Sequence, residues 1–319
     1  MGTHGCVRSL VWRERYAGAL SAGSMRMIRN AFAKLNLSLA VGPPEPPGSP
    51  KPGFHRIVSH MHAVDLADEV RLEHQNGGTS SHAVRWAEGA VFSTAIDWPV
   101  ETDLAVRAHR LLEERVGRSL PVTLELVKRI PVGGGLGGGS TDAAATLLGL
   151  IELFELSVAD DVVLGIAMEL GSDVAFFCDR MAGVGPPRPA VVTGFGEGVR
   201  RVPSERGDVV LIVPPFGCET KAVYRAFDRR AQFVGLSDYV AAAPERNDLA
   251  VAAIEAQPRL RDVWDAAAGA VPEAAVRMSG SGSTLFVRTE PGAGGGVAAR
   301  LGNVTALSGC AIVTSRLVG

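Results

Sequence analysis

Residues 131–142 are the part of the sequence whose composition points most directly to chemistry. They read Pro-Val-Gly-Gly-Gly-Leu-Gly-Gly-Gly-Ser-Thr-Asp and run into a stretch rich in alanine and leucine, which favours a helix. Glycines let other groups approach the backbone closely, and Ser140, Thr141 and Asp142 are residue types that cap helix N-termini. We therefore expect a bare loop that leads into a helix N-terminus, where N–H groups and the helix dipole favour an anion such as phosphate.

Three other interpretations of these glycines fit less well. A flexible linker seldom leads directly into a helix with cap residues in place. A P-loop has lysine where this chain has Gly139. Gly133, Gly135 and Gly138 satisfy the dinucleotide pattern G-x-G-x-x-G, but that pattern needs a buried strand of a βαβ unit before it. The preceding segment, 122–130, alternates polar and apolar residues, which predicts a half-exposed, antiparallel strand.

A phosphate loop without its own lysine requires a cation from elsewhere in the chain. Lys34 is a candidate, because residues 28–41 alternate like a strand and place Lys34, Asn36 and Ser38 on one face. The alternative, that these polar side chains are only solvated, stays open at this point. Asp173 follows a helix-terminating glycine and precedes an apolar run, and this pattern by itself indicates a turn residue.

Strands and helices are expected on both sides of these residues. Asn or small residues mark turns, and apolar periodicity of 2 or 3.6 separates strands from helices. The expected helices cover residues 103–117, the stretch after the glycine loop to about 154, residues 157–171 and a stretch from 219. The expected later strands are 209–213, 285–287 and 311–315, with a second small-residue turn at 279–284.

The composition sets limits on the class of protein. At 319 residues, with 46% apolar and 21% charged residues, the chain is typical of a globular protein with two domains. A net charge of −2 without a basic block disfavours a nucleic-acid partner. Four scattered cysteines suit a reducing compartment and no apolar run approaches ~20 residues, so we expect a cytoplasmic protein with no membrane partner. His60 and His62 share a strand face, but no third ligand stands at a usual metal spacing.

Three motifs, in this order, resemble those of the galactokinase, homoserine kinase, mevalonate kinase and phosphomevalonate kinase (GHMP) superfamily. They are residues 33–37 (Ala-Lys-Leu-Asn-Leu), the glycine segment 131–143 and residues 279–283 (Ser-Gly-Ser-Gly-Ser). The resemblance extends over about residues 27–315 and implies an ATP-dependent small-molecule kinase with a two-lobed α+β fold.

The resemblance also implies how the chain divides. Residues 27–187 would form the N-terminal lobe that binds the ATP phosphates, and residues 188–319 a C-terminal ferredoxin-like lobe, with the active site between the lobes. Residues 1–26 are expected to be a disordered extension. The chain is expected to be a monomer or a weak homodimer.

Within the superfamily, the chain is most similar to the branch that phosphorylates cytidine diphosphate methylerythritol in the non-mevalonate isoprenoid (terpenoid) route. Phe54 stands where that branch usually has tyrosine, after a longer, proline-rich loop, and the glycine segment ends Ser-Thr rather than Ser-Ser. Both changes keep the relevant chemistry, an aromatic face and a hydroxyl group. The segments that carry the likeness are residues 53–55, 171–174, 194–197 and 246–249.

The reaction implied is transfer of the ATP γ-phosphoryl group to the tertiary 2-hydroxyl of the methylerythritol unit. Asp173 would be the general base, and Lys34 would favour ionised Asp173 and stabilise charge on the phosphoryl group. Mg²⁺ would bridge the phosphates, and no side chain is assigned to it as a ligand. The residues expected to hold the ATP phosphates are Pro131, Gly133, Gly134, Gly135, Leu136, Gly137, Gly138, Gly139, Ser140 and Thr141.

The acceptor would be recognised at its cytidine end. His55 would bond the cytosine edge, while Phe54 and Tyr224 would stack on its faces. Asn36 would orient one of the reacting groups. The alternatives are another GHMP kinase that acts on homoserine or a mevalonate derivative, a nicotinamide-dependent oxidoreductase that uses the G-x-G-x-x-G loop, and a catalytically inactive, ligand-binding relative.

Overall fold

The computed structural model describes residues 25–230 and 246–319. The extension expected at residues 1–26 therefore lies outside the described residues, apart from its last two positions, and Arg26 is already the first residue of a strand. The strands are β1 (Arg26–Pro44), β2 (His55–His74), β3 (Ser81–Trp86), β4 (Val122–Lys128), β5 (Ala190–Gly194), β6 (Gly198–Arg201), β7 (Asp208–Val213), β8 (Val276–Met278), β9 (Leu285–Thr289) and β10 (Ala311–Val318).

The helices lie between these strands in sequence. The α-helices are α2 (Leu104–Val116), α3 (Gly138–Leu153), α4 (Asp160–Leu170), α5 (Val174–Phe177), α6 (Thr220–Arg229), α7 (Ala250–Ala256), α8 (Arg259–Ala270) and α9 (Gly294–Gly302). Short 3₁₀ turns are η1 (Val100–Thr102), η2 (Arg180–Ala182) and η4 (Thr305–Leu307).

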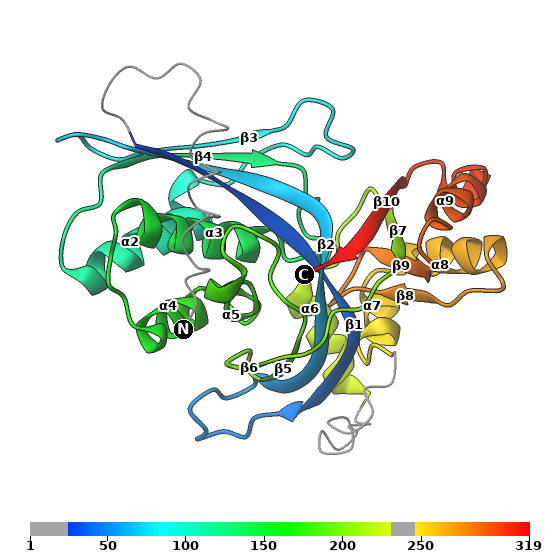
Figure 1. Ribbon diagram of the computed structural model, residues 1–319. Coiled ribbons are helices and arrows are strands. Elements are labelled where there is room, and N and C mark those ends of the chain that lie inside the picture. Colours follow the sequence, from blue (N-terminus) through cyan, green and yellow to red (C-terminus); the bar gives the residue numbers. More distant parts are fainter. Residues whose placement is uncertain (1–24, 231–245) are drawn as a thin grey trace, which may run out of the picture.

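The long strand β2 connects the two halves of the sheet. One edge of β2 pairs antiparallel with β1 along most of its length. Its other edge pairs in succession with β5, β10 and β4. Because β10 also pairs with β7, one continuous sheet runs in the order β3-β4-β2-β10-β7-β9-β8 (Figure 1).

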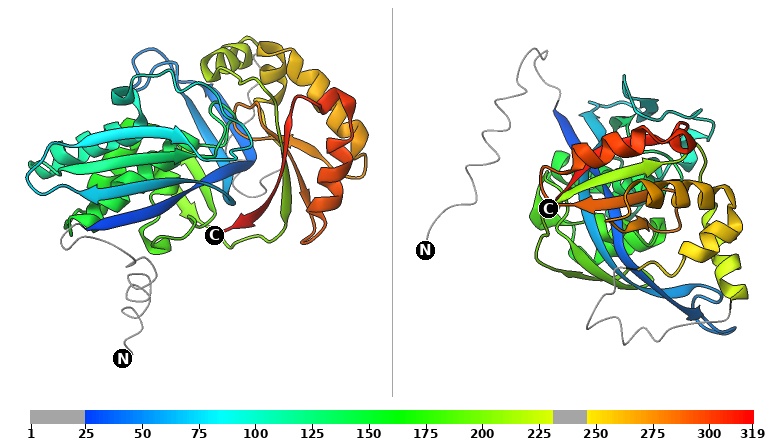
Figure 2. Two further views of the ribbon diagram at one scale, coloured as in Figure 1. Left: turned by 90° about the horizontal axis from the view of Figure 1, so that it is seen from above. Right: turned by 90° about the vertical axis from the view of Figure 1, so that its right-hand side faces the viewer.

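Helices cover the two halves of this sheet separately. The N-terminal helices α2 to α5 lie against one face of the part that contains β1, β2 and β4, and helix α3 is buried along nearly its whole length (Figures 1 and 2). In the C-terminal half, β7, β8, β9 and β10 alternate with helices in the order β-α-β-β-α-β and lie side by side as β10-β7-β9-β8, which is the ferredoxin-like pattern. The predicted α+β fold of two lobes is thereby confirmed.

A compact apolar cluster joins the two lobes behind the glycine loop. It contains Leu35 and Leu37 of β1, Leu136 of the loop, Leu211 of β7 and Phe286 of β9, all buried. The expected lobe boundary near residue 187 stays a prediction. The hairpin of β5 and β6, which follows that position, pairs with β2.

The secondary-structure predictions were largely confirmed, and the corrections in this part of the fold concern α4 and β4. Asp103 caps α2 by accepting a hydrogen bond from the Ala105 N–H (2.9 Å), and Gly117 ends that helix in the left-handed region, as expected. Helix α4 begins at Asp160 and not at Ser157. Strand β4 pairs antiparallel with β2 but parallel with β3, and its last three residues are buried, so the expectation of a half-exposed strand was wrong at that end.

Candidate active site

Two irregularities in β1 surround the predicted lysine and asparagine. The register between β1 and β2 shifts between Phe32 and Lys34 and again between Asn36 and Ser38. Such bulges turn side chains away from the direction that a regular strand would give them. Both sides of β1 are covered here, and Lys34 is only 2% exposed. The alternative that this strand face is solvated is therefore wrong.

The ammonium group of Lys34 contacts the carboxylate of Asp173. Asp173 lies about 140 residues later in the chain, just after the end of α4. The distance between Lys34 Nζ and Asp173 Oδ2 is 3.3 Å. Lys34 also donates to Asn36 Oδ1, and Asn36 Nδ2 donates to Ser59 Oγ (2.8 Å). The Lys34 ammonium group is thus held between the carboxylate of Asp173 and the amide oxygen of Asn36, whose side chain is fixed by Ser59. These contacts fix the position of the ammonium group.

The glycine loop enters α3 differently from the sequence expectation. Helix α3 begins at Gly138, and its N-cap is Gly137 with φ +73° and no side-chain capping bond. Ser140, Thr141 and Asp142 are therefore helical residues, and the expectation that they cap the helix was wrong. The physical reason is space: a Cβ at Gly137 would lie 2.9 Å from the ring of Phe177 and 3.1 Å from Lys34 Cγ, so only glycine can make this turn.

The small-residue turn at 279–284 holds the glycine loop against β1. The Ser279 hydroxyl donates to the Gly135 carbonyl (2.9 Å) and accepts a hydrogen bond from the Asn36 N–H (3.3 Å). The Thr284 N–H donates to the Gly134 carbonyl (3.1 Å). A Cβ at Gly135 would lie 2.3 Å from the Ser279 carbonyl oxygen, so the two turns touch backbone to backbone. The resembling motifs at 33–37, 131–143 and 279–283 thus meet in one place.

Asp173 directly precedes α5, but its side chain makes no capping hydrogen bond to that helix. Its carboxylate instead faces Lys34 and is partly open to solvent. A second contact fixes the backbone beside it, because the β5–β6 turn packs on Ser172. Gly196 in that turn has φ +111°, and a Cβ there would lie 2.0 Å from the Ser172 carbonyl oxygen.

If Asp173 is the general base that the sequence predicts, replacing Gly196 by alanine is expected to lower kcat about tenfold or more, because the new methyl group pushes Ser172 and Asp173 away and small displacements of reacting groups are costly. Steady-state kinetics with ATP and the acceptor measures this. Gly165→Ala is the matched control: Gly165 lies in α4 with no atom within 4 Å of an added Cβ, and alanine favours the helix by about 1 kcal/mol. Equal kcat values for the two variants would show that the Gly196 contact does not position Asp173.

Two cavities flank the glycine loop. The first, about 320 Å³, is lined by Lys34, Asn36, Asp173 and Tyr224 together with loop glycines and Ser140. The second, about 340 Å³, is lined by the whole loop from Ile130 to Gly139 and by side chains of α2 and β4. A loop with a cavity on each side can hold a phosphate chain between a nucleotide and an acceptor, with the first-turn N–H groups of α3 available to anions.

The residues expected at the cytidine end are only partly brought together. Tyr224 lines the cavity that contains Asp173, and the pKa of its hydroxyl is raised by burial and by the negative charge of Asp173. His55 is buried behind it, with ring centroids 5.0 Å apart, and its Nδ1 lies 2.8 Å from the Gly42 carbonyl oxygen. Phe54 is 63% exposed and is not among the residues that line the cavity.

Sequence reasoning missed the residues that hold the site from outside. Ser59 supports Asn36 and, as an isolated serine, gives no signal in the sequence, whereas Ser279, which joins β1 to the loop, lies within the motif at 279–283. Asn247 belongs to the segment 246–249 that carries the family likeness, and its amide donates to the carbonyls of Met278 (2.9 Å) and Gly280 (2.7 Å) in the small-residue turn. His62 is a structural residue: its Nε2 accepts from the Glu205 N–H (3.2 Å), and its other ring nitrogen lies 3.0 Å from the Ala63 carbonyl oxygen.

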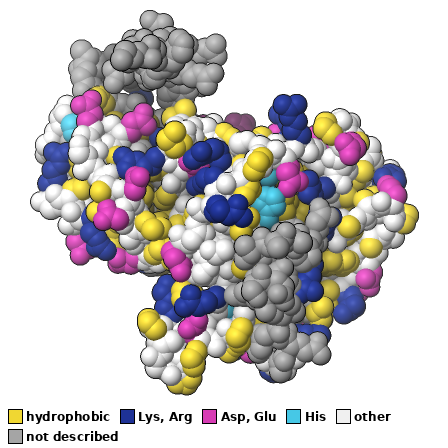
Figure 3. Space-filling view, turned by 60° about the horizontal axis from the view of Figure 1, so that its bottom comes forward, with side chains coloured by type: hydrophobic (Ala, Val, Ile, Leu, Met, Phe, Trp, Pro, Cys, Tyr) yellow, Lys and Arg dark blue, Asp and Glu magenta, His cyan; other side chains and the backbone are white. Residues whose placement is uncertain are grey.

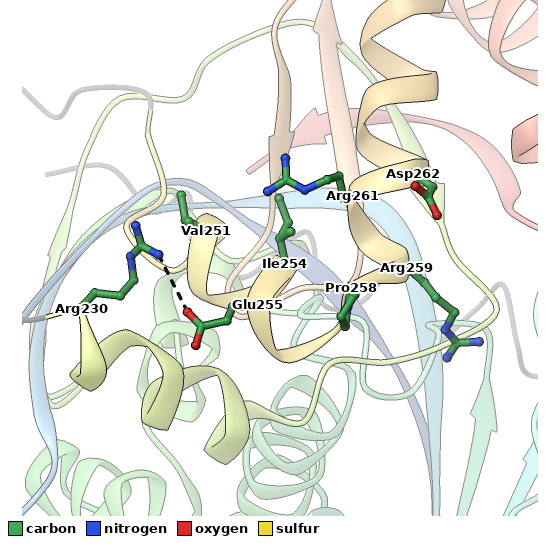
Figure 4. Close-up of a pocket in the computed structure, with 8 residues that line it drawn as sticks. All are labelled: Arg230, Val251, Ile254, Glu255, Pro258, Arg259, Arg261 and Asp262. Carbon is green, nitrogen blue, oxygen red and sulfur yellow. Dashed lines mark ion pairs between the residues drawn. The ribbon is translucent and has the colours of Figure 1, made fainter.

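A larger pocket, of about 580 Å³, lies over the end of α6 and the helices α7 and α8. Figure 4 shows Arg230 and Glu255 facing each other across it, with Nη1 and Oε2 3.8 Å apart. None of its lining residues belongs to the three motifs, so its size does not make it the reaction site. On the face shown in Figure 3, basic and acidic side chains are interspersed, as the net charge of −2 suggests.

Comparisons with known proteins agree with this geometry. Residues 103–179 match the family described as "GHMP kinases N terminal domain". A 4-diphosphocytidyl-2-C-methyl-D-erythritol kinase of Desulfitobacterium hafniense is 34% identical over 83% of this chain and 90% of its own length. The corresponding protein of Polynucleobacter asymbioticus is 32% identical over 81% and 82%.

Solved structures show the same fold. A crystal structure titled 4-(cytidine 5'-diphospho)-2C-methyl-D-erythritol kinase matches 92% of this chain and 100% of its own, with a TM-score of 0.68 and 28% identity. The homoserine kinase of Cytophaga hutchinsonii, at 18% identity and a TM-score of 0.62, shares the fold alone.

Fold, loop and lysine–aspartate pair together define a two-lobed small-molecule kinase of the GHMP class. With relatives above 30% identity over most of both chains, the chain belongs to the family of 4-diphosphocytidyl-2-C-methyl-D-erythritol kinases. Among the described residues, no helix is long and apolar enough to span a bilayer.

Proposed function

We propose that this chain transfers the γ-phosphoryl group of ATP to the 2-hydroxyl of 4-diphosphocytidyl-2-C-methyl-D-erythritol, in the non-mevalonate route to isoprenoid precursors. The observation that carries the proposal is the 3.3 Å pair of Lys34 Nζ and Asp173 Oδ2 in a cavity lined by the glycine loop. Family membership supports the choice of acceptor, because the relatives carry that substrate in their names. The homoserine, mevalonate and nicotinamide alternatives are not favoured by these relatives.

In the proposed mechanism Asp173 accepts the proton of the acceptor 2-hydroxyl as that oxygen bonds to the γ-phosphorus. The bond between the γ-phosphorus and the β,γ-bridging oxygen breaks, and ADP leaves. Lys34 stabilises ionised Asp173 before the reaction and the charge on the attacking and transferred oxygens during it. Asn36 orients the Lys34 ammonium, since the structure places its side-chain oxygen on that group.

The ATP phosphates would lie along residues 131–141, with the α3 N-terminus facing them. Magnesium would supply charge neutralisation on the phosphate oxygens. The Ser140 hydroxyl, which lines the 320 Å³ cavity beside the loop, is a hard oxygen donor that fits this ion. Mg²⁺ usually keeps several waters and binds through one or two protein oxygens plus phosphates, so a dedicated cage of side chains is not required.

For the cytidine end, Tyr224 supplies the stacking face and His55 supports it from behind. His55→Ala is expected to raise KM for the cytidine acceptor about tenfold, because loss of one hydrogen-bonding and packing group of this kind costs 1–2 kcal/mol. The KM for ATP should stay nearly unchanged. Steady-state kinetics with each substrate varied in turn measures both constants.

The control for His55→Ala is His74→Ala, a histidine on the same strand whose ring packs on Phe154, with centroids 5.0 Å apart, outside both cavities. It should leave both KM values within about twofold. Equal increases in the two KM values of His55→Ala would contradict a role at the cytidine end.

The proposed function itself is tested by ATP consumption with a panel of acceptors. Phosphorylation of 4-diphosphocytidyl-2-C-methyl-D-erythritol, and of neither homoserine nor mevalonate, is the expected result. Turnover of another acceptor with no turnover of the cytidine compound would overturn it. A cytoplasmic location and a monomer or weak homodimer remain part of the proposal, to be checked by cell fractionation and sedimentation.

A further inference from the structure

A buried ion triad lies directly beneath the glycine loop, and the mechanism above does not use it. Lys128, the last residue of β4, bonds through Nζ to the carboxylates of Asp68 on β2 and Asp142 on α3. All three side chains are almost completely buried. Buried ion pairs are seldom retained for stability alone, because removing charges from water costs as much as their attraction returns.

The triad connects the two ends of the glycine loop. On the entry side, Asp68 Oδ1 accepts the N–H groups of Arg129 and of Ile130 (2.8 Å), the residues that lead from β4 into the loop. On the exit side, Asp142 lies in the first turns of α3, whose N-terminus faces the phosphate position. Lys128 bonds to both carboxylates, so it links the entry to the exit.

The triad also borders the nucleotide side of the loop. Lys128 and Asp142 line the 340 Å³ cavity together with the loop glycines. A Cβ at Gly138 would lie 3.6 Å from Lys128 Nζ, so the ammonium lies immediately behind the first residue of α3. Burial alone would lower the pKa of Lys128, but the carboxylates of Asp142 and Asp68 raise it by more. Lys128 therefore stays charged and bound to both carboxylates.

We propose that Lys128, Asp68 and Asp142 are positioning residues that fix the spacing between the two ends of the glycine loop and thereby set its affinity for ATP. The inference rests on the proposed function, since it takes the loop to be the phosphate site. Backbone N–H groups bind phosphate only where they converge, and a loop of glycines has no side chains of its own to keep that shape.

Asp142→Ala is the sharpest test. It cuts the link to α3 but leaves the Lys128–Asp68 pair balanced in charge, so no uncompensated buried charge remains and the variant should fold. We expect Kd for ATP, measured by calorimetry without acceptor, to rise about tenfold or more, while KM for the acceptor changes less than twofold.

Asp142→Asn is the rescue variant. Its amide oxygen can still accept from Lys128, and burial raises the pKa of the native Asp142 carboxyl, so replacing it by a neutral amide of the same size costs little. This variant should bring Kd for ATP back to within about threefold of wild type. A positioning role predicts that Kd for ATP rises in Asp142→Ala and recovers in Asp142→Asn. A general loss of packing does not predict this difference between the two variants.

The control is Asp179→Ala, which removes another buried carboxylate, one that accepts from Arg188 Nε (2.8 Å) and lines neither loop cavity. It should lower thermal stability without changing Kd for ATP. If wild type binds ATP and Asp142→Ala binds it equally well, the positioning role is wrong. If wild type itself does not bind ATP, the proposed function fails and the inference drawn from the triad fails with it, which distinguishes that outcome from a failure of the positioning role alone.

Discussion

Replacing Asp173 by asparagine is expected to lower kcat at least 10²-fold, because general-base catalysis typically contributes that much and the amide cannot accept the proton. KM for ATP should change little, since Asp173 lines the 320 Å³ cavity and not the 340 Å³ cavity on the other side of the glycine loop, where the nucleotide is proposed to bind. Single-turnover assays with ATP and the cytidine acceptor measure the chemical step directly. A kcat within a few-fold of wild type would remove Asp173 from the role of base.

The interpretation of that result depends on the variant being folded. Asparagine is nearly the same size, Asp173 is partly exposed, and Lys34 keeps its bond to Asn36, so the buried ammonium retains one partner. Thermal unfolding should therefore shift by only a few degrees. A large loss of kcat with an unchanged unfolding temperature separates lost chemistry from lost structure.

The proximity of Lys34 and Asp173, the proposed reacting pair, agrees with the sequence prediction, while their catalytic roles stay a prediction. The loop lacks a lysine and so requires a cation from elsewhere, and the family resemblance points to Lys34 for that cation and to Asp173 for the base. The structure places their charged atoms 3.3 Å apart. Local patterns alone left both residues ambiguous, and it was the resemblance of the motifs around them that predicted their proximity.

The helix start was mispredicted because residue preference was weighed without the packing around it. Ser140, Thr141 and Asp142 have cap-forming side chains, but the close approach of Phe177 and Lys34 forces the turn to Gly137. Tertiary contact overrode local propensity. Ser140 is free to line the cavity as a consequence.

The alternating residue pattern of β4 contains a sequence signal for the ion triad. Val122, Leu124, Leu126 and Lys128 share one face of β4, and the first three are fully buried. A charged residue in phase with an apolar face requires a buried partner. Its partners could not be identified from sequence, because Asp68 is 60 residues away along the chain.

Contacts between backbones left no signal at all. The approach of Gly196 to Ser172 and of Gly135 to Ser279 depends on how distant turns come together. Glycine at such a position looks the same in sequence as glycine in an ordinary turn. Only the structure separates glycines that merely turn the chain from those that allow two turns to touch.

Lys34→Met is expected to lower kcat roughly 10²–10³-fold, the loss typical of removing one preorganised group that stabilises transition-state charge. Lys128 cannot substitute for Lys34, since two carboxylates hold it beneath the loop. The methionine side chain fits the buried position, and the partly exposed Asp173 can be hydrated, so the variant should fold. Steady-state kinetics and thermal unfolding measure the two effects.

The double variant Lys34→Met/Asp173→Asn distinguishes a shared role from two separate ones. If lysine acts on the same proton transfer that aspartate performs, removing both should cost little more than removing the more important one, because residues that act as a unit are strongly non-additive. If the fold-loss of kcat in the double variant equals the product of the losses in the two single variants, Lys34 acts on the phosphoryl group independently of Asp173. The 3.3 Å contact between their charged atoms favours the first result, since the protonation state of Asp173 and the charge of Lys34 are coupled at that distance.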